Sequence, residues 1–500
     1  MIALMGLTDG SAWRGRGVLR GGLLTGTASI TLALAAAAAG ALLAQKFGRN
    51  ARTDGFLAAY AVYLVLVLAA QSIRMVVVPN LTRARAAGRL GAETRAYATA
   101  FLAFAVPVSV IVVLLSHPIG DAITGSLPGS SSAIASRAIV VVVPAAFIQL
   151  LAAIAASALA ALDSYGTAAA GFAGGGVAGL VVFAALADGH GLIALAWGLA
   201  VNAIVSLAVP VASLLRRHAL LGGEPAQPAV LSRLWHLVQG AAVPVALQCC
   251  YLLALRFSSK LGVGQVTSLT YAYLFASTLV MATAFSLGIA TSAPLTRRGF
   301  DPIAAARHVV HAAWISLILV GAAAGVFALV GGRIVELVLG TAYGGNVGTQ
   351  LGRLVVWLSL WMLAWVSFAL AFPLVFVAAR QRLLVPLALA GVVVFIPVGL
   401  AFRSAWGLDG IAAALGVAVL VLALGLIWSL SPRTLALASV GLARLGLAVG
   451  AAVALAFGGL AVALSPVPAA VVGVLVYGAI IVALRSLGLG EAWSYVRGLH

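Results

Sequence analysis

The sequence predicts an all-α polytopic membrane protein with about fourteen transmembrane helices, and three observations lead to this fold class. Hydrophobic residues make up 63% of the 500 residues, charged residues make up 8%, and the mean hydropathy is +1.17. The apolar residues form continuous runs of roughly 20 residues, the length of helix that crosses a ~30 Å hydrocarbon core. The runs lack the strict alternation of a membrane β-barrel, so helices must satisfy the backbone in lipid.

The apolar runs can be placed in order along the chain, with most charged residues between them. Asp163-Ser164-Tyr165-Gly166 and Arg380-Gln381-Arg382 are typical of tight turns between neighbouring helices. We expect spans near residues 21–44, 56–78, 97–116, 138–162, 167–187, 191–214, 237–257, 266–292, 309–330, 354–378, 383–401, 408–430, 441–463 and 467–486.

Matching motifs recur at an offset of roughly 215–219 residues, which indicates an internal repeat. Pro79-Asn80-Leu81-Thr82-Arg83 matches Pro294-Leu295-Thr296-Arg297, and Gly191-Leu192-Ile193-Ala194 matches Gly410-Ile411-Ala412-Ala413. An even number of spans separates the copies, so the two six-helix lobes share one orientation as a parallel pseudo-repeat. Two extra C-terminal helices follow the repeat.

The repeat sets the expected domain organisation. We predict an N-lobe over residues 1–220 with spans 1–6, followed by an inter-lobe linker over 221–236. A C-lobe with spans 7–12 occupies 237–433, and spans 13 and 14 with a cytoplasmic tail occupy 434–500. Two lobes of this kind suggest alternating access between them, and a static scaffold is the other interpretation.

The net charge of +18 reflects membrane topology rather than nucleic-acid binding. The 29 lysines and arginines are scattered over short loops and form no basic stripe, so we expect no nucleic-acid partner. With the N-terminus in the cytoplasm, about 19 basic residues fall on the cytoplasmic side and about 8 on the outer side. The positive-inside rule therefore predicts that both termini are cytoplasmic.

The sequence gives no sign of enzymatic chemistry. Cys249 and Cys250 are adjacent within a span, and no Cys/His spacing indicates a metal site. Serine, histidine and aspartate are not arranged for nucleophilic attack, and no Gly-rich loop with lysine is present for phosphate binding. We therefore expect a non-enzyme without metal or cofactor.

Three basic residues are candidates for substrate binding, because charge within a span is costly and usually functional. Arg74 lies inside the second span, Arg256 ends the seventh, and Lys260 follows about one turn later. A guanidinium at such a position can hold a phosphate with paired hydrogen bonds. Snorkelling of these side chains to the membrane surface is the alternative.

A charged outer loop precedes the second span and suggests a gate. Asp54 stands at the start of the helix, where a carboxylate favours the helix dipole, and it is expected to pair with Arg52 or Arg49. Lys46 completes this group. Carboxylates are nearly absent from the spans themselves, which argues against an ion-coupled drug exporter. Five amides could contact a sugar or a neighbouring helix: Gln71, Gln149, Asn202, Gln239 and Gln248.

Several motifs, in their order and spacing, resemble those of the MurJ/MviN lipid II flippase family of the MOP exporter superfamily. Thr53-Asp54-Gly55-Phe56 is similar to the family's T-D-A-F entry to the second span, and Val78-Pro79-Asn80-Leu81 to its V-P-x-L exit. Residues 264–272 (GQVTSLTYA) resemble the start of the eighth span, and 192–198 (LIALAWG) the end of the first lobe. Ala379-Arg380-Gln381 resembles the A-R-Q that follows the tenth span.

The resemblance implies a flippase in the cytoplasmic membrane of a bacterium. It would carry a polyprenyl-diphosphate-linked saccharide, such as a lipid II-like peptidoglycan precursor, across the membrane. Its partners would be membrane lipid and the lipid-linked saccharide, with cell-envelope synthesis proteins as further candidates and cell shape as the affected process.

The chain departs from the family where the family's first two spans carry charges. Residues 34–41 (LAAAAAGA) and 62–70 (VYLVLVLAA) contain none. This departure leaves two further functions open. One is an exporter of a polysaccharide unit or an amphipathic small molecule in the same superfamily. The other is a non-transporting membrane scaffold for cell-envelope synthesis.

Overall fold

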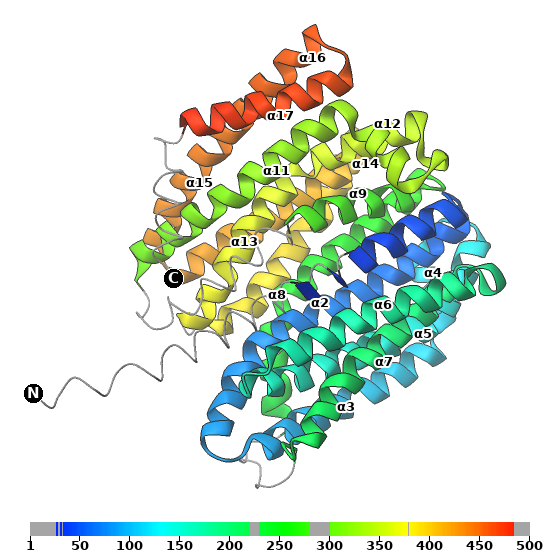
Figure 1. The fold of residues 1–500 in the computed structure, drawn as a ribbon, viewed down its shortest axis with the longest axis vertical. Helices are drawn as coiled ribbons and strands as arrows, with labels where there is room; N and C mark the ends of the chain where they lie inside the picture. The colour runs from blue at the N-terminus through cyan, green and yellow to red at the C-terminus, as the bar shows by residue number, and fades with distance from the viewer. Residues whose placement is uncertain are drawn as a thin grey trace, which may run out of the picture. The chain divides into compact units, whose positions relative to one another are not determined.

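The computed structural model describes residues 27–28, 31–32, 34–220, 230–280, 301–378 and 380–484, and these are almost wholly helical (Figure 1). No strand occurs within those ranges, which confirms the all-α prediction. The first described helical segment includes Leu34–Phe47. The long helices that follow are α2 (Ala51–Ala86), α3 (Leu90–Leu114), α5 (Gly129–Ala161), α6 (Tyr165–His190), α7 (Ile193–Arg216), α8 (Val230–Ser258), α9 (Gln265–Val280), α11 (Pro302–Leu339), α13 (Ser359–Val377), α14 (Leu384–Leu430), α15 (Pro432–Val453) and α17 (Pro466–Ala483).

Shorter helices lie between the long ones. They are α4 (Ser116–Thr124), α12 (Gly345–Trp357), α16 (Gly459–Ala463) and four single turns, Ser259–Leu261, Thr341–Tyr343, Gln381–Leu383 and the π-helical Ala454–Gly458. Both predicted tight turns are confirmed, since α5 ends at Ala161 and α6 begins at Tyr165, and a 3₁₀ turn separates α13 from α14.

Within the described residues each predicted span falls on helix, and ten helices there are long and apolar enough to cross a membrane, judged by length and composition. Residues 21–26, 29, 30 and 33 of the first predicted span lie outside the described residues. These ten helices are fewer than the about fourteen predicted spans for two reasons. The first, second and eighth predicted spans fall on helices outside the ten, and α14 alone contains two spans. Within α14, Gly407 has a φ of +59° that breaks the helix between the predicted spans 383–401 and 408–430. Glycine adopts this conformation without the Cβ clash of other residues.

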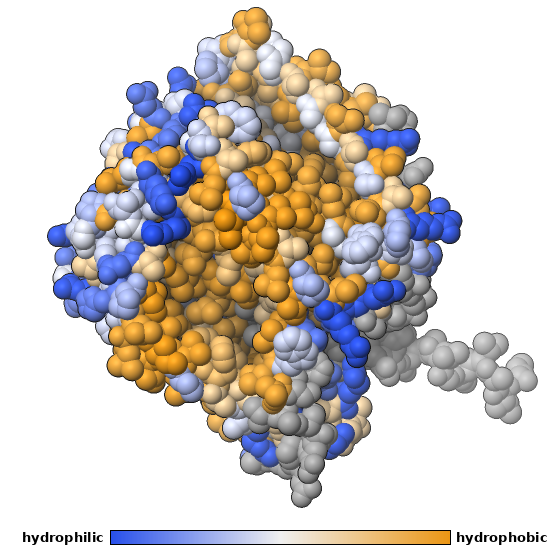
Figure 2. All heavy atoms as spheres, turned by 180° about the vertical axis from the view of Figure 1, so that it is seen from behind, coloured by the Kyte–Doolittle hydropathy of each residue, from blue (hydrophilic) through white to orange (hydrophobic). Residues whose placement is uncertain are grey.

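The surface of the protein is largely apolar, as a lipid environment requires. Figure 2 shows apolar side chains over a wide part of one face, with charged side chains gathered mainly toward its margins. Leu447, Val462 and Leu475 of the last three helices are 75%, 91% and 70% exposed. Exposure of this extent in water would favour aggregation, whereas lipid tails solvate these side chains.

The chain forms two compact units that do not match simple halves of the sequence. Unit 1 comprises residues 1–43, 59–122 and 132–241, and unit 2 comprises 44–58, 123–131 and 242–500. Helices α2 and α8 therefore each contribute residues to both units. The predicted lobe boundaries stay a prediction. Residues 221–229 of the predicted linker, 281–292 of the eighth span and 485–500 of the tail lie outside the described residues.

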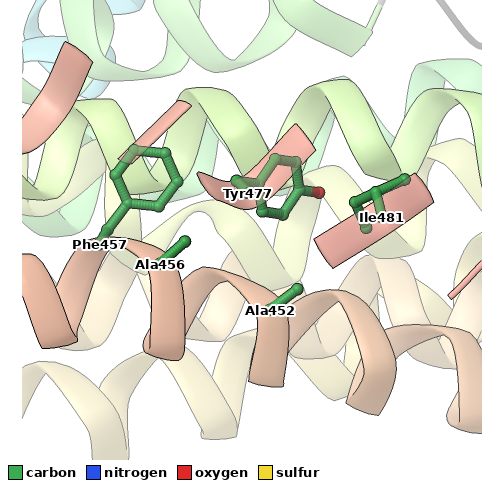
Figure 3. Packing of buried hydrophobic residues seen from close by; sticks show 5 residues of the cluster. All are labelled: Ala452, Ala456, Phe457, Tyr477 and Ile481. Carbon is green, nitrogen blue, oxygen red and sulfur yellow. The ribbon is translucent and has the colours of Figure 1, made fainter. Parts of the chain in front are cut away.

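In unit 2 the last helices pack on α11 through small residues around one aromatic ring. Helices α15 and α17 both pack against α11. Figure 3 shows the buried cluster at this junction, formed by Ala452, Ala456, Phe457, Tyr477 and Ile481. The Tyr477 hydroxyl donates a 2.9 Å hydrogen bond to the carbonyl of Ile318 in α11.

The Phe457 ring is held between two glycines. A Cβ added at Gly325 of α11 would lie 2.2 Å from Phe457 Cδ2, and one added at Gly473 of α17 would lie 2.6 Å from Cδ1. The ring therefore cannot move away from one helix without meeting the other. Close approach at small residues is how membrane helices gain packing energy when the surrounding solvent is itself apolar.

We predict that Gly325→Ala destabilises the protein by about 1–3 kcal/mol, because the added methyl overpacks the Phe457 site. Thermal unfolding in detergent, followed by size-exclusion chromatography, measures the change. Gly459→Ala is the matched control, since a Cβ there meets nothing within 4 Å. Equal stability of the two variants would contradict the packing described for Phe457.

Candidate functional site

The Asp54 carboxylate at the start of α2, in unit 2, accepts three hydrogen bonds. Its side chain is fully buried. Oδ1 accepts a 2.8 Å hydrogen bond from the Thr267 amide and another from the Thr267 hydroxyl, and Oδ2 accepts a short one from the Gly264 amide. These amides belong to the first turn of α9 and the residue before it. Asp54 therefore caps α9 from a distance of more than 200 residues in sequence, where the helix dipole favours an anion.

The neighbouring residues hold this capping contact in place. The Arg49 Nε donates a 2.8 Å hydrogen bond to the Gly264 carbonyl, so Gly264 is bound on both its amide and its carbonyl. Asn50 Oδ1 accepts from the Thr53 amide at 3.0 Å, which caps α2 itself. The Ser131 hydroxyl donates to the Ala51 carbonyl at 2.6 Å. We call Arg49, Asp54, Gly264 and Thr267 the α2–α9 junction.

Two opposing effects act on the pKa of the Asp54 carboxyl. Asp54 precedes the predicted second span, and its burial raises the pKa of the carboxyl above the ordinary value. The hydrogen bonds from Thr267 and Gly264, together with the charge of Arg49, lower this pKa and so oppose the rise. Arg49 thus acts on Asp54 through its charge, while its own hydrogen bond goes to the backbone.

The other predicted gating residues differ in their exposure. Arg52 and Lys46 are exposed, and Arg49 is half-buried. Asp54 was expected to pair with Arg52 or Arg49, and its hydrogen bonds come from the Gly264 amide and from the amide and hydroxyl of Thr267. Main-chain amides at a helix start offer an anion a fixed site. The structure thus brings Asp54 and Arg49 together at Gly264.

Arg256 and Lys260 also belong to unit 2, at the end of α8. The Arg256 guanidinium lies against the turn after α4, where a Cβ added at Gly125 would meet Nη1 at 1.6 Å. Ser126 Oγ in the same turn donates to the Ser259 carbonyl at 3.3 Å. Arg256 Nη1 is buried and has no hydrogen-bond partner among the described residues. Lys260 is exposed.

Arg74 belongs to unit 1 and lies well inside α2. It is half-buried, and Tyr165 at the start of α6 is close enough to act on its charge. The exposed Arg83 lies nine residues further along the same helix, about 13 Å away at ~1.5 Å per residue. Arg74 is therefore far from the charged end of α2 and within the apolar stretch.

A polar and aromatic cluster in unit 2 includes one residue named from the sequence, Gln248, and its other members were not predicted. Gln248 Nε2 of α8 donates to the Tyr273 hydroxyl of α9 at 3.1 Å, and the Tyr251 hydroxyl donates to Thr270 Oγ1 at 3.1 Å. The Tyr251 and Tyr273 rings stack with centroids 4.0 Å apart, and Trp361 follows at 4.9 Å from Tyr273. The run of hydroxyl-bearing residues over 267–273 is the sequence signal that could have identified it.

We predict that Asp54→Asn destabilises the protein by about 1–3 kcal/mol and reduces its activity, because an amide cannot serve both α9 amides and the Thr267 hydroxyl as an anion does. Thermal unfolding in detergent is the measurement. Arg52→Gln, an exposed change two residues away, is the control and should unfold like the wild type. A wild-type unfolding temperature for Asp54→Asn would show that the junction contributes nothing.

Comparison with known proteins identifies the fold. No protein-family model matches the sequence, and no curated protein matches it. Among solved structures, the chain is similar to the lipid II flippase MurJ in an inward closed conformation, with a TM-score of 0.71, 13% identity, and coverage of 93% of this chain and 99% of that one.

Two other similar structures belong to the MOP superfamily. A multidrug resistance MATE family transporter in an inward-facing conformation gives a TM-score of 0.58 at 15% identity, covering 83% of this chain and 95% of the other. A MOP superfamily transporter from Pyrococcus furiosus, described by the reverse polarity of its binding pocket, gives 0.60 at 13% identity, covering 83% and 94%. The resemblance drawn from the motifs is therefore confirmed at the level of fold: the chain has the fold that MurJ shares with MOP-superfamily transporters.

Proposed function

We propose that this protein is a flippase that moves a polyprenyl-diphosphate-linked saccharide, of the lipid II type, across the cytoplasmic membrane of a bacterium by alternating access. The observation that carries the proposal is the similarity to MurJ over 93% of the chain and 99% of that structure. Both termini would be cytoplasmic, as the distribution of basic residues favours. Cell-envelope synthesis proteins are the partners that such a cargo implies.

Arg74 is the residue we assign to the anionic head of the cargo. It is a guanidinium within an apolar helix, and the exposed end of that helix is about 13 Å further on. An intramembrane arginine persists where it meets an anion or a polar cavity. A diphosphate accepts paired hydrogen bonds from a guanidinium better than from an ammonium. Arg256 and Lys260 are weaker candidates, since Arg256 packs against the Gly125 turn and Lys260 is exposed.

The α2–α9 junction is the part we assign to gating. Residues 51–58 of α2 belong to unit 2 and the rest of α2 to unit 1, so α2 is one of the segments that connect the units, and the junction holds the part of α2 that belongs to unit 2. The junction is made of charge-assisted hydrogen bonds, which form and break as a set. Arg52 and Lys46 are exposed and close in sequence to the junction, and their positive charges would influence the electrostatic potential at Asp54.

One observation favours a second cargo class. Residues 34–41 and 62–70 carry no charge, where the resembled flippase family carries arginines and carboxylates. A less charged path suits a polysaccharide unit or an amphipathic small molecule, and MATE transporters share the fold. Such an exporter has the same architecture and would not depend on Arg74.

The test is transport in proteoliposomes that contain a fluorescent polyprenyl-diphosphate disaccharide. We predict that the wild type exposes the inner-leaflet cargo to an external diphosphatase, and that Arg74→Ala slows this at least tenfold, because it removes the guanidinium that binds the diphosphate. Arg83→Ala, an exposed change on the same helix, is the matched control and should transport normally.

The remaining outcomes discriminate between the functions. Transport that survives Arg74→Ala would overturn the assignment of that residue. No transport of the diphosphate cargo, with efflux of an amphipathic dye from the same vesicles, would support the exporter. Absence of both activities in folded protein would favour the scaffold interpretation.

A further inference from the structure

One end of unit 1 carries a depression of about 320 Å³ that the transport proposal does not use. Its lining comes from four chain segments: the last turn of α2, the turn into α3, the end of α5 and the residues after α7. The lining residues are Arg85, Gly88, Leu90, Gly91, Leu162, Arg217 and Ala219. We call this depression the basic pocket.

The two arginines of the basic pocket are fixed by the turn between α5 and α6. Arg85 Nη1 donates to the Ala161 carbonyl at 2.6 Å and to Asp163 Oδ2 at 2.7 Å. Arg217 Nη2 donates to the Ser164 hydroxyl at 3.0 Å. A guanidinium has five N–H donors, so each arginine keeps donors on its other nitrogens for a ligand. The Arg85 side chain is 45% exposed, which leaves it accessible.

Gly91, another lining residue, allows two stretches of backbone to approach closely. A Cβ added at Gly91 would lie 2.7 Å from the Ala219 carbonyl oxygen, so only glycine lets α3 pack on the chain after α7. Arg95 Nη1 donates to the Leu220 carbonyl and ties that chain to α3. No side chain caps the N-terminus of α3 at Leu90, and the helix dipole adds a positive partial charge at this end.

The surrounding charges favour an anionic ligand. Glu93 is committed to the buried Arg233 at 3.1 Å, and Asp163 to Arg85. Four further arginines lie on the same turns and helix ends: Arg83, Arg89, Arg95 and Arg216. The pocket thus joins basic donors to the apolar walls of Leu90 and Leu162 at the end of spanning helices, the level at which lipid headgroups lie.

We propose that the basic pocket binds the phosphate of an anionic phospholipid from the surrounding membrane, with Arg85 and Arg217 as its ligands. The guanidinium groups would bind the phosphodiester, and Leu90 and Leu162 would contact the glycerol and upper acyl region. This is a lipid site separate from any cargo site, and it stands whether or not the chain is a flippase.

Native mass spectrometry of the full chain in detergent, titrated with phosphatidylglycerol or phosphatidylcholine of equal chain length, tests the proposal. We expect the wild type to prefer phosphatidylglycerol, and Arg85→Gln with Arg217→Gln to weaken its binding about tenfold. The control pair is Arg89→Gln with Arg216→Gln, which removes the same charge from the same turn and helix end outside the lining. Equal losses in the two pairs would overturn the site.

One further variant and one competition measurement test the same site. Asp163→Asn should strengthen phosphatidylglycerol binding, because it frees Arg85 from a competing carboxylate. Asparagine tolerates the φ of +58° at this position, so the turn should persist. Unchanged or weaker binding by this variant would contradict the role of Arg85. Displacement of the lipid by equimolar inorganic phosphate would show a free-phosphate site and overturn the lipid assignment.

Discussion

The structure depends on one constraint: a backbone amide in lipid has no water with which to form a hydrogen bond. Inside a helix each backbone amide is bonded within the helix, and only the amides and carbonyls at the helix ends need partners from elsewhere. Asp301 and Ser431 meet this need locally, capping α11 and α15 from the residue just before each helix. At α9 the partner comes from a distant segment, since Asp54 supplies the cap. A local requirement of one helix thereby becomes a tertiary contact.

Contacts between helices follow from the same solvent. Lipid tails are as apolar as leucine, so helices gain little from burying apolar area and must gain from close packing. In unit 1 a Cβ added at Gly179 of α6 would lie 2.5 Å from the Gly198 carbonyl of α7. The glycines on either side of Phe457 play the same part in unit 2. At positions such as these, glycine allows one helix to approach its neighbour more closely than a residue with a Cβ could.

The fold class, the order of spans and the tight turn at 162–164 could be predicted from sequence, because hydropathy and turn residues act locally. The membership of the two units could not, because which segments pack together depends on contacts made far apart in the chain. Asp54 was predicted to act in gating, which stays a prediction, and its expected partners were Arg52 or Arg49. The donors are the backbone amides of Gly264 and Thr267 and the Thr267 hydroxyl, and the identity of these residues does not show that they lie near a residue more than 200 positions earlier in the chain. The break at Gly407 could not be predicted either, because the sequence does not show which of its many glycines has a positive φ.

The division of the chain between the units has a consequence for biosynthesis. Residues 44–58 and 123–131 are made early but belong to a unit whose other residues begin at 242. Asp54 therefore enters the membrane before the amides of Gly264 and Thr267 have been translated. During that interval the chain carries a carboxylate without its final partners, and unit 2 is completed only when the later helices arrive. Two fragments divided in the segment 221–229 would each lack part of a unit, so neither half is a self-contained folding module.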